Sequence, residues 1–441
     1  MRGNSPAHAE ATDVVIVGAG ISGCAAAQEC ETRGLDYRLL EQNAEPGGLT
    51  RSIDIGEALF DYTGHFLHLA RWSKPSEIPH AGQRDSDWVR VRKKSAVHFG
   101  RRLVRAPFQY HLGDLPVRLG RRCLDDFRRR PVAAPSASFR DHLLSAFGRR
   151  MAEIFFFPYN EKIHARSLDR LTGDMGTRFF PGGDPRLVER GFARPDAPGP
   201  SQYNTFFWYP RKGGIGVLAR GLARDLRHLR TACRVERLDL DRRILWTTEG
   251  QIAFRRLISS APLQWLCERS TDDRLRRWGR KLGCSRVLCL NLLVRGALPS
   301  MFSGCQWVYV PGRDIPFYRF GVYSHLPARF GPPGTTALYV EAAFPGEAAR
   351  PGASVVVDDI LASVEKLRWV RRSDVLAAAA QWIDPAYVRF DEGRPAAVKD
   401  IFGLLAERGV SCVGRYGRWD YLSMEDSIAS GLEAVRRLPP C

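Results

Sequence analysis

A glycine-rich stretch near the N-terminus carries residue types that suit a phosphate cradle, a flavin pocket or a metal site. Residues 46–69 read PGGLTRSIDIGEALFDYTGHFLHL, with Arg51 following a glycine pair and with two histidines, His65 and His68. An arginine beside a glycine turn matches the geometry of a phosphate. Histidines three residues apart are also conceivable metal ligands, but no cysteine or acidic partner stands at metal-site spacing. We therefore expect no metal here, and we expect His68 to be a packed or surface histidine.

The residues before this stretch predict the βαβ unit that positions it. A β-branched run at 13–17 leads into GAGISG, which holds Gly18, Gly20 and Gly23, and an alanine-rich helix follows. A second predicted strand ends at Glu41, about 20 residues past the glycines, where a carboxylate accepts hydrogen bonds from a ribose. The first glycine makes the turn, the second admits a pyrophosphate and the third allows close helix packing beside a positively polarised helix N-terminus. The pattern therefore predicts a bound dinucleotide.

The chain beyond Glu41 favours FAD over NAD. Its sequence NAEPGGLTRS supplies a turn at Gly47 and Gly48 and a cation at Arg51, and a β-excursion then replaces a further βα unit. The order GxGxxG, glutamate, GGxxRS and FDxxGH resembles the flavoproteins with two dinucleotide-binding domains, which include amine oxidases, protoporphyrinogen oxidases and UDP-galactopyranose mutases. This resemblance implies non-covalent FAD, with the GGLTR loop under its pyrophosphate and His65 near its isoalloxazine.

Later segments resemble the mutase branch of these flavoproteins over nearly the whole chain. The segments are PFQYHL, FFFPYNEKIHA, FFWYPRKGGIG, WVYVPGRDIPFYR and VGRYGRWDYLSMEDSIASG. In that family N5 of reduced flavin attacks the anomeric carbon of a nucleotide sugar and expels the nucleotide diphosphate, and reclosure of the ring turns pyranose into furanose. The resemblance therefore implies catalysis by a cofactor held in its reduced form, with NAD(P)H as a possible reductant.

The same resemblance implies roles for individual residues. Arg319 would bind the diphosphate, Tyr309 would contact a phosphate and His65 would lie beside the flavin; the alternative for the first two is an exposed strand arginine and a core tyrosine. Met424 would begin a helix whose N-terminus stabilises negative charge on reduced flavin. Further cofactor contacts are implied for Val235, Gly414 and Arg415. Substrate contacts are implied for Tyr159, Asn160, Trp208, Arg211 and Tyr421.

Two parts of the sequence bear on the implied substrate-binding residues. Trp208 stands where eukaryotic-type mutases have an arginine, so Arg211 and Lys212 are candidate replacements. Tyr159, Asn160 and Lys162 fall where a predicted helix ends near the cleft, and capping of that helix is an equally good explanation for them. Pro158 is expected to stop the helix that precedes them.

The predicted fold class is α/β. A discontinuous Rossmann-like FAD-binding domain would comprise 13–104, 205–283 and 400–441, after a disordered tail at 1–12. A helical substrate or cap domain is predicted at 105–204, and an antiparallel-sheet substrate domain at 284–399.

Composition limits the partners. The chain has 441 residues, a net charge of +18 carried mostly by scattered arginines, and ten cysteines without a CxxC pair. We expect a small-molecule substrate and no nucleic acid, while peripheral contact with an anionic membrane stays open. No apolar run reaches the roughly 18–20 residues of a membrane helix, and no secretory h-region is visible, so a cytoplasmic location is expected. The oligomeric state is not predicted.

Two further functions stay open at this stage. A flavin-dependent oxidoreductase of the amine oxidase or protoporphyrinogen oxidase type would remove hydride from its substrate and pass electrons to O2 or a quinone. A flavin-binding scaffold without turnover is the third reading. The mutase is the preferred prediction because the PYNEK and PFYR segments discriminate better than the glycine motifs do.

Overall fold

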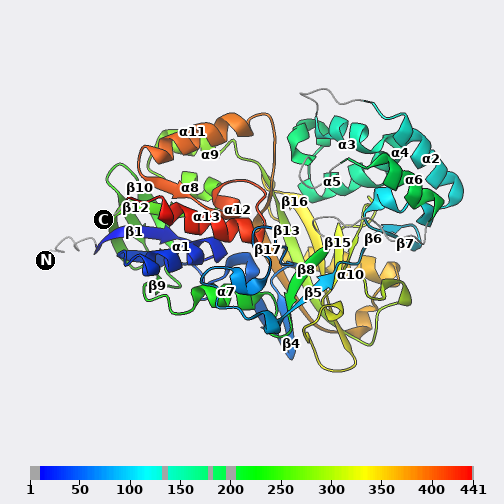
Figure 1. The fold of residues 1–441 in the computed structure, drawn as a ribbon, viewed down its shortest axis with the longest axis horizontal. Helices are drawn as coiled ribbons and strands as arrows, with labels where there is room; N and C mark the ends of the chain where they lie inside the picture. The colour runs from blue at the N-terminus through cyan, green and yellow to red at the C-terminus, as the bar shows by residue number, and fades with distance from the viewer. Residues whose placement is uncertain (1–9, 132–137, 177–181, 195–204, 440–441) are drawn as a thin grey trace.

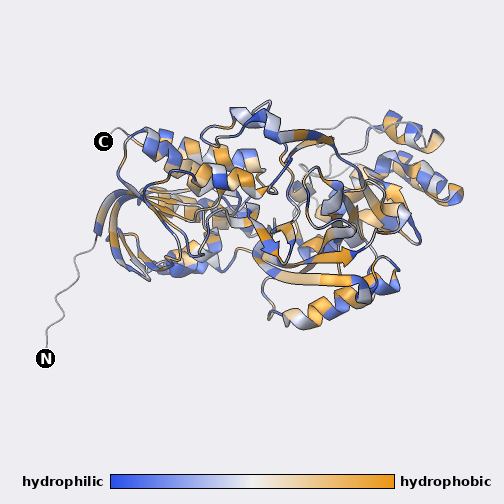
Figure 2. Cartoon of the chain, turned by 90° about the horizontal axis from the view of Figure 1, so that it is seen from below, coloured by the Kyte–Doolittle hydropathy of each residue, from blue (hydrophilic) through white to orange (hydrophobic). Residues whose placement is uncertain are grey.

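Two seven-stranded sheets organise the protein (Figure 1). The computed structural model describes residues 10–131, 138–176, 182–194 and 205–439. Figure 2 shows largely hydrophobic strands in the second sheet and helices that alternate between hydrophilic and hydrophobic residues, as amphipathic covering helices do. Across the described ranges, no helix has the length and apolar character needed to cross a bilayer.

The first sheet is the predicted dinucleotide-binding sheet. Its parallel core places β12 and β2 on either side of β1, with Val15 opposite Leu257 and Arg38. The β10–β11–β12 meander extends one edge in antiparallel fashion, and its last turn falls at Gly250 as the sequence predicts. The strands are β1 Glu10–Val17, β2 Tyr37–Leu40, β9 Leu229–Arg230, β10 Val235–Asp239, β11 Ile244–Thr247, β12 Gly250–Ser259 and β18 Val410–Cys412.

One prediction at the N-terminus needs correction. The predicted disordered tail 1–12 is too long, because β1 already begins at Glu10. Glu10, Ala11 and Thr12 pair with residues 252–254 of β12, a strand more than two hundred positions away that local sequence does not reveal. Residues 1–9 lie outside the described residues.

Helices from both ends of the chain pack against the first sheet. In Figure 1 the N-terminal helix α1 and the C-terminal helix α13 lie side by side against the sheet, so the two ends of the chain meet in one layer. The helices of this part are α1 Ile21–Thr32, α7 Gly216–Ala223, α8 Leu263–Arg269, α9 Asp273–Gly279, α11 Arg394–Ala406, α12 Gly414–Gly417 and α13 Met424–Arg436.

The second sheet follows strand periodicity closely. Along β13, Leu288, Leu290 and Leu292 point toward the apolar face of helix α10 (Ala353–Lys366), where Ile360 is fully buried. The alternate residues of β13 face the opposite side of the sheet, so this strand contributes side chains to two separate hydrophobic cores. The strands are β6 Ser95–Phe99, β7 Arg102–Arg105, β13 Cys284–Arg295, β14 Trp307–Tyr309, β15 Arg319–Val322, β16 Thr335–Pro345 and β17 Val375–Val388.

Three small groups of elements complete the fold. Strands β3 (Ser52–Ile55) and β4 (Ala58–Asp61) form a hairpin, and β5 (Trp88–Arg92) pairs with β8 (Phe206–Pro210). Although β6 and β7 fall at the end of the predicted FAD-binding segment 13–104, they pair into the second sheet through β14. The predicted helical segment contains α2 Val117–Arg128, α3 Phe139–Phe147, α4 Arg149–Met151, α5 Phe157–His164 and α6 Pro185–Ala193.

Pro158 does not stop its helix, which corrects the prediction. The helix runs from α4 through a π-helical turn at Ala152–Phe156 into α5, where the proline occupies the first turn. A π turn replaces i→i−4 hydrogen bonds with i→i−5 bonds, so the register of the helix already changes directly before the proline, which has no N–H to donate. The helix therefore continues through Tyr159 and Asn160 to His164.

A buried carboxylate, Asp61, ties four parts of the fold together. Its side chain accepts hydrogen bonds from Ser52 (2.7 Å), from the hydroxyl of Tyr209 and from the backbone N–H of Ile215 (2.9 Å). Its backbone carbonyl accepts from Asn291 of β13 at 3.1 Å. Burial raises the pKa of Asp61 to about 6, although the hydrogen bonds from Tyr209, Ser52 and Ile215 oppose that shift.

Replacing Asp61 with alanine should destabilise the fold strongly. The change removes the acceptor of three buried or partly buried donors, and an unsatisfied buried polar group costs about 1–3 kcal/mol. We expect urea unfolding to show a loss of roughly 3 kcal/mol or more. Asp54→Ala, at an exposed position of neighbouring β3, is the matched control and should stay within ~0.5 kcal/mol of wild type. Equal losses in both variants would contradict the role of Asp61.

Candidate active site

A cavity of about 1840 Å³ runs between the glycine loops of the first sheet and the second sheet. Its first part is lined by Gly18, Gly20, Glu41, Gly48 and Arg51, all of them predicted cofactor contacts. Val235, Arg415, Tyr421 and Met424 also line it, and these come from distant parts of the chain. The structure thus brings most of the predicted cofactor-binding residues to one continuous space.

The GAGISG turn is shaped for a ligand at one glycine and for packing at another. A Cβ built on Gly20 would meet nothing within 4 Å, so this glycine faces open space inside the cavity. A Cβ on Gly23 would lie 1.9 Å from the carbonyl oxygen of Gly18, so the third glycine allows the close approach of α1 to the turn. This division of roles agrees with the pattern that predicts pyrophosphate next to the second glycine.

The GGLTR loop lies directly against that turn. The N–H of Gly47 donates to the carbonyl of Ala19 at 2.7 Å, and a Cβ on Gly48 would lie 3.3 Å from the Cα of Gly20. Arg51 is held by its Nε, which donates to the carbonyl of Gly48 at 3.0 Å. The arginine therefore stands beside the glycine turn, where a phosphate would lie.

Glu41 is buried at the end of β2. One of its carboxylate oxygens accepts from the N–H of Ala19 and the other from the N–H of Asn43, both at 2.9 Å. Val235 is buried close by and also lines the cavity. The carboxylate is thus fixed beside the space where a ribose would bind.

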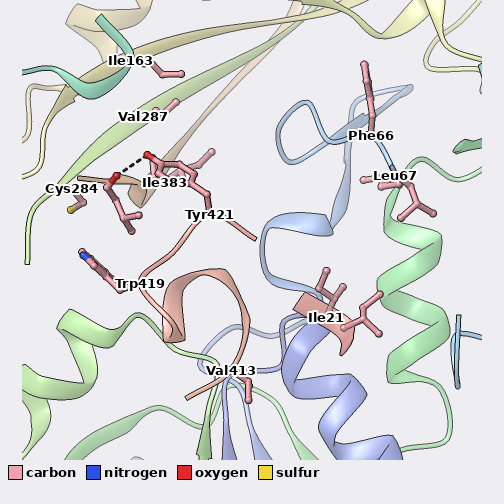
Figure 3. Close-up of a cluster of buried hydrophobic side chains, with 14 of the residues drawn as sticks. Ile21, Phe66, Leu67, Ile163, Cys284, Val287, Ile383, Val413, Trp419 and Tyr421 are labelled. Atoms are coloured by element: carbon pink, nitrogen blue, oxygen red, sulfur yellow. Dashed lines mark hydrogen bonds between the residues drawn. The ribbon is translucent and has the colours of Figure 1, made fainter. Parts of the chain in front are cut away.

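The C-terminal segment closes this part of the cavity. Tyr421 packs among buried side chains of the second sheet, including Cys284 and Ile383 (Figure 3), and its hydroxyl donates to the carbonyl of Val388 at 2.7 Å. The guanidinium of Arg415 lies 4.6 Å from the Tyr421 ring. Met424 opens α13 after the N-cap Ser423, as the sequence predicts.

Gly414 has a packing role instead of a cavity contact. Among the described residues that line the cavity Gly414 does not appear, and its N–H donates to Ser430 at 2.8 Å. A Cβ on Gly414 would lie 2.2 Å from the Oγ of Ser22 in α1. The lack of a side chain at Gly414 therefore allows the close approach of α12 to α1.

The second part of the cavity contains a row of side chains on neighbouring strands. Tyr309 on β14 faces Arg319 on β15, and Arg319 faces Glu341 on β16. Arg319 and Glu341 form an ion pair at 3.2 Å, with side chains that are 14% and 2% exposed. Arg319 is therefore a buried cavity residue, which excludes the exposed strand arginine considered from the sequence.

Glu341 is a site residue that the sequence analysis missed. Its carboxylate also accepts hydrogen bonds from the hydroxyls of Thr63 and Tyr318. The available signal was a single acid inside the apolar run TTALYVEAAF, because a buried carboxylate in a strand needs partners. Trp307, two residues before Tyr309, was missed as well, and it lines the cavity.

Several described residues that line the cavity have a buried polar side-chain atom without a hydrogen-bond partner, and three of these atoms belong to residues near Tyr309. They are the Oδ1 of Asn160, the Nε of Arg319 and the Nε1 of Trp307, and all three residues line the cavity. The amide of Asn160 is oriented by its Nδ2, which donates to the carbonyl of Phe156 at 2.7 Å. Buried polar groups are normally satisfied, so these atoms leave hydrogen-bonding capacity unused in the wall of the cavity.

Aromatic rings surround these atoms. Tyr309 meets Tyr159 edge-on at a centroid distance of 5.3 Å and Trp307 at 5.9 Å. The ammonium of Lys93 lies 4.3 Å from the Trp307 ring centroid. Tyr309 and Tyr159, both predicted substrate contacts, are therefore brought together beside Arg319.

His65 lines the cavity next to this network. Burial lowers its pKa to about 4; the charge of Glu341 opposes the shift, whereas Arg415 and Arg319 reinforce it. The imidazole is therefore neutral near pH 7. Its Nδ1 is buried and has no hydrogen-bond partner among the described residues.

Trp208 and Arg211 do not reach the cavity, which corrects their prediction as substrate contacts. Along β8, the side chains of Phe207 and Tyr209 are buried, and strand alternation places the side chain of Trp208 on the other face. The backbone of Trp208 pairs with that of Leu67. Arg211 is exposed, and its Nε donates to the carbonyl of Ser86 at 3.0 Å. Arg211 and Lys212, the candidate replacements for the arginine of eukaryotic-type mutases, are both exposed and are not among the described residues that line the cavity.

The described residues contain no group of three or more histidine, cysteine or acidic side chains that could hold a metal ion. His68 lies outside any such group, and its Nδ1 is 3.0 Å from the carbonyl oxygen of Phe206.

Comparisons with known proteins define the fold. The sequence model of NAD(P)-binding Rossmann-like domains matches residues 16–75. The structure of reduced UDP-galactopyranose mutase gives a TM-score of 0.88 at 24% identity, covering 96% of this chain and 94% of that chain. A protein from Exiguobacterium sp. 255-15 named as a protoporphyrinogen oxidase gives 0.73 at 16% identity, with 98% and 99% covered. An engineered double mutant of putrescine oxidase gives 0.63 at 15% identity, with 97% and 99% covered.

These likenesses confirm the predicted fold class. The chain has a Rossmann-like dinucleotide-binding domain joined to mixed α/β elements, in the arrangement shared by a flavoprotein mutase and by flavoprotein oxidases. At 24%, 16% and 15% identity, these likenesses describe the fold of the chain.

The titration of His65 should report the charges around it. We expect the midpoint near pH 4, against an ordinary value of about 6.5. Glu341→Gln should lower the midpoint further because it removes a favourable negative charge, and Arg415→Ala should raise it because it removes a repelling cation. Histidine-ring NMR checks this, with the His65 signal assigned by its loss in His65→Asn. A midpoint near 6.5 that neither charge variant moves would contradict the site electrostatics.

Proposed function

We propose that this protein is an FAD-dependent enzyme of the amine oxidase superfamily that acts as a nucleotide-sugar pyranose–furanose mutase. Arg319 carries the proposal, because its largely buried guanidinium lines the same cavity as the GAGISG turn and the GGLTR loop, which together we call the dinucleotide cradle. A guanidinium at this position suits the diphosphate of a nucleotide sugar. The likeness to UDP-galactopyranose mutase supports this choice.

The cradle fits FAD. Gly20 leaves open space for a pyrophosphate, Glu41 is fixed beside a ribose position and Arg51 stands by the turn. The cavity volume of about 1840 Å³ exceeds the roughly 300–1,000 Å³ of an ordinary ligand pocket. One continuous space therefore suits an extended cofactor together with a second ligand.

Several residues of the chain would serve the sugar reaction. Reduced FAD, when bound, supplies the nucleophile for the anomeric carbon of the sugar. Arg319 would hold the diphosphate while it leaves and when it returns, and Tyr309 and Tyr159 would exclude water beside it. Lys93 and Arg415 add positive charge to the same cavity. His65, neutral at pH 7, would accept or donate a hydrogen bond without adding charge.

A second function, an FAD-dependent oxidoreductase, is favoured by a different observation. Arg319 is paired with Glu341, so part of its charge is already neutralised, and Tyr159, Tyr309 and Trp307 form an aromatic wall. Such a wall suits an amine or an apolar substrate. The likenesses to putrescine oxidase and to the protoporphyrinogen oxidase-named protein agree with this alternative.

Gly20→Val should abolish FAD binding without unfolding the protein. The valine side chain would fill the open space at the turn, where the pyrophosphate is proposed to bind. We expect the variant to stay colourless after reconstitution with FAD, measured as flavin absorbance per protein. Gly403→Val, at an exposed glycine with no neighbour within 4 Å, is the control and should stay yellow. A wild-type protein that binds no FAD would overturn the proposal.

The redox requirement separates the two functions. The mutase should convert a nucleotide sugar only after the flavin has been reduced, because the oxidised cofactor lacks the nucleophilic lone pair, and it should consume no stoichiometric reductant. Dithionite or NAD(P)H would serve as the reductant, and chromatography of UDP-galactopyranose and its furanose isomer under anaerobic conditions measures the reaction. Oxidised enzyme that bleaches on adding an amine and recovers its colour in air would instead establish the oxidoreductase.

A further inference from the structure

A long loop connects the two strands that carry Tyr309 and Arg319. Strand β14 ends at Tyr309 and β15 begins at Arg319, so these residues form the last cross-strand pair before the loop 310–318. The hairpin closes with a hydrogen bond from the N–H of Val310 to the carbonyl of Tyr318 at 2.8 Å. Any shift of this loop would therefore change the spacing of two cavity side chains.

One lysine from another part of the fold holds this loop. The Nζ of Lys162 in α5 donates to the carbonyl of Val310 at 2.8 Å, to that of Gly312 at 2.9 Å and to that of Phe317 at 2.5 Å. An ammonium has three N–H donors, and here each of them has its own carbonyl acceptor. The contacts span the loop from its first residue almost to its last.

The helix that carries Lys162 also carries two cavity residues. Tyr159 and Asn160 lie within three positions of it in α5 and line the cavity. The ring of Tyr159 meets that of Tyr309 edge-on, so the helix and the hairpin face each other across the ligand space. A more exposed ion pair between Glu161 and Arg313 provides a second link between the same two elements.

We propose that Lys162 is a positioning residue that fixes the 310–318 loop against α5, and thereby sets the spacing of Tyr309 and Arg319 from Tyr159 and Asn160. Lys162 acts through these residues and does not itself touch the ligand. The inference rests on the proposed nucleotide-diphosphate function only for the identity of the ligand. The clamp on the loop stands on the geometry alone.

The physical argument depends on what the carbonyls lose without the lysine. Three carbonyl oxygens converge on one ammonium, and a residue without donors at position 162 leaves them to find water or to separate. Separation loosens the loop first, because its own backbone hydrogen bonds are few. Arginine keeps the positive charge and offers five donors, so it should restore most of the clamp.

The test compares Lys162→Met, Lys162→Arg and Arg319→Ala in the FAD-loaded protein. Amide hydrogen exchange measured by mass spectrometry reports the loop, and titration with UDP, followed by flavin or tryptophan fluorescence, reports the ligand site. Lys366→Met, at an exposed position near the end of α10, is the control for loss of a lysine elsewhere. FAD content and melting temperature are measured for every variant.

We expect exchange in 310–318 to be about tenfold faster in Lys162→Met, since one lost hydrogen-bonding partner is worth about that factor. UDP affinity should also fall about tenfold, with FAD content unchanged. Lys162→Arg should recover most of both, and the control should match wild type. In the Arg319→Ala background, Lys162→Met should lower UDP affinity by clearly less than its roughly tenfold effect in the wild-type background, because the part of the effect that acts through Arg319 is absent and only the part through Tyr309 remains.

Each contrary outcome has a distinct meaning. Unchanged loop exchange in Lys162→Met would overturn the clamp, and additive effects with Arg319→Ala would overturn action through the arginine. If wild type binds no UDP, the proposed nucleotide function fails. The exchange data then decide the clamp alone: faster exchange that arginine reverses supports it, and unchanged exchange overturns it.

Discussion

The buried carboxylate of Asp61 is the constraint on which the active-site geometry depends. It lies at the end of β4, and its hydrogen bonds join the β3–β4 hairpin to β8, to the start of α7 and to β13. Only two residues later, Thr63 donates to Glu341 in the second sheet. The segment that leads to His65 is therefore fixed to two strands of the second sheet, β13 and β16, as well as to β8 and the start of α7, and His65 enters the cavity from this support.

The second sheet contributes its part through strand register. Because Tyr309, Arg319 and Glu341 are direct cross-strand neighbours, a slip of one residue in β15 would turn Arg319 away from the cavity. The ion pair with Glu341 keeps the largely buried guanidinium charged and oriented. The same register thus sets both the stability of the arginine and its direction.

The electrostatics of the cavity explain why its chemistry is not decided by the fold. Cations at Arg319, Arg415 and Lys93 suit an anionic substrate, whereas Glu341 reduces their effect and the tyrosines add aromatic surface. Isomerases and oxidoreductases share this architecture, and one fold supports several reactions when the same cofactor sits beside different side chains. The two proposed functions would differ in how the cavity binds a substrate and in the redox state that the cofactor needs.

Local patterns in the sequence determined the dinucleotide-binding half of the protein. The GAGISG turn, Glu41, the GGLTR loop and the helix start at Met424 depend on neighbours within a few residues, and these were predicted correctly in position. Side-chain alternation also indicated an antiparallel sheet within 284–399, but it did not indicate that β6 and β7 join this sheet through β14. The resemblance to known flavoproteins, and not periodicity, pointed to Arg319, Tyr309 and Tyr159.

Only the tertiary structure decided the rest of the site. Glu341 becomes a site residue because β15 places Arg319 opposite it, and Lys162 becomes a clamp because a loop some 150 positions away folds onto α5. Trp208 lies outside the cavity because the face on which β8 presents each side chain depends on its pairing with β5. Arg211 follows the end of β8, and its side chain donates to the backbone carbonyl of Ser86 at the surface. Such pairings join residues far apart in the chain, and their energies depend on burial and register that no local stretch of sequence contains.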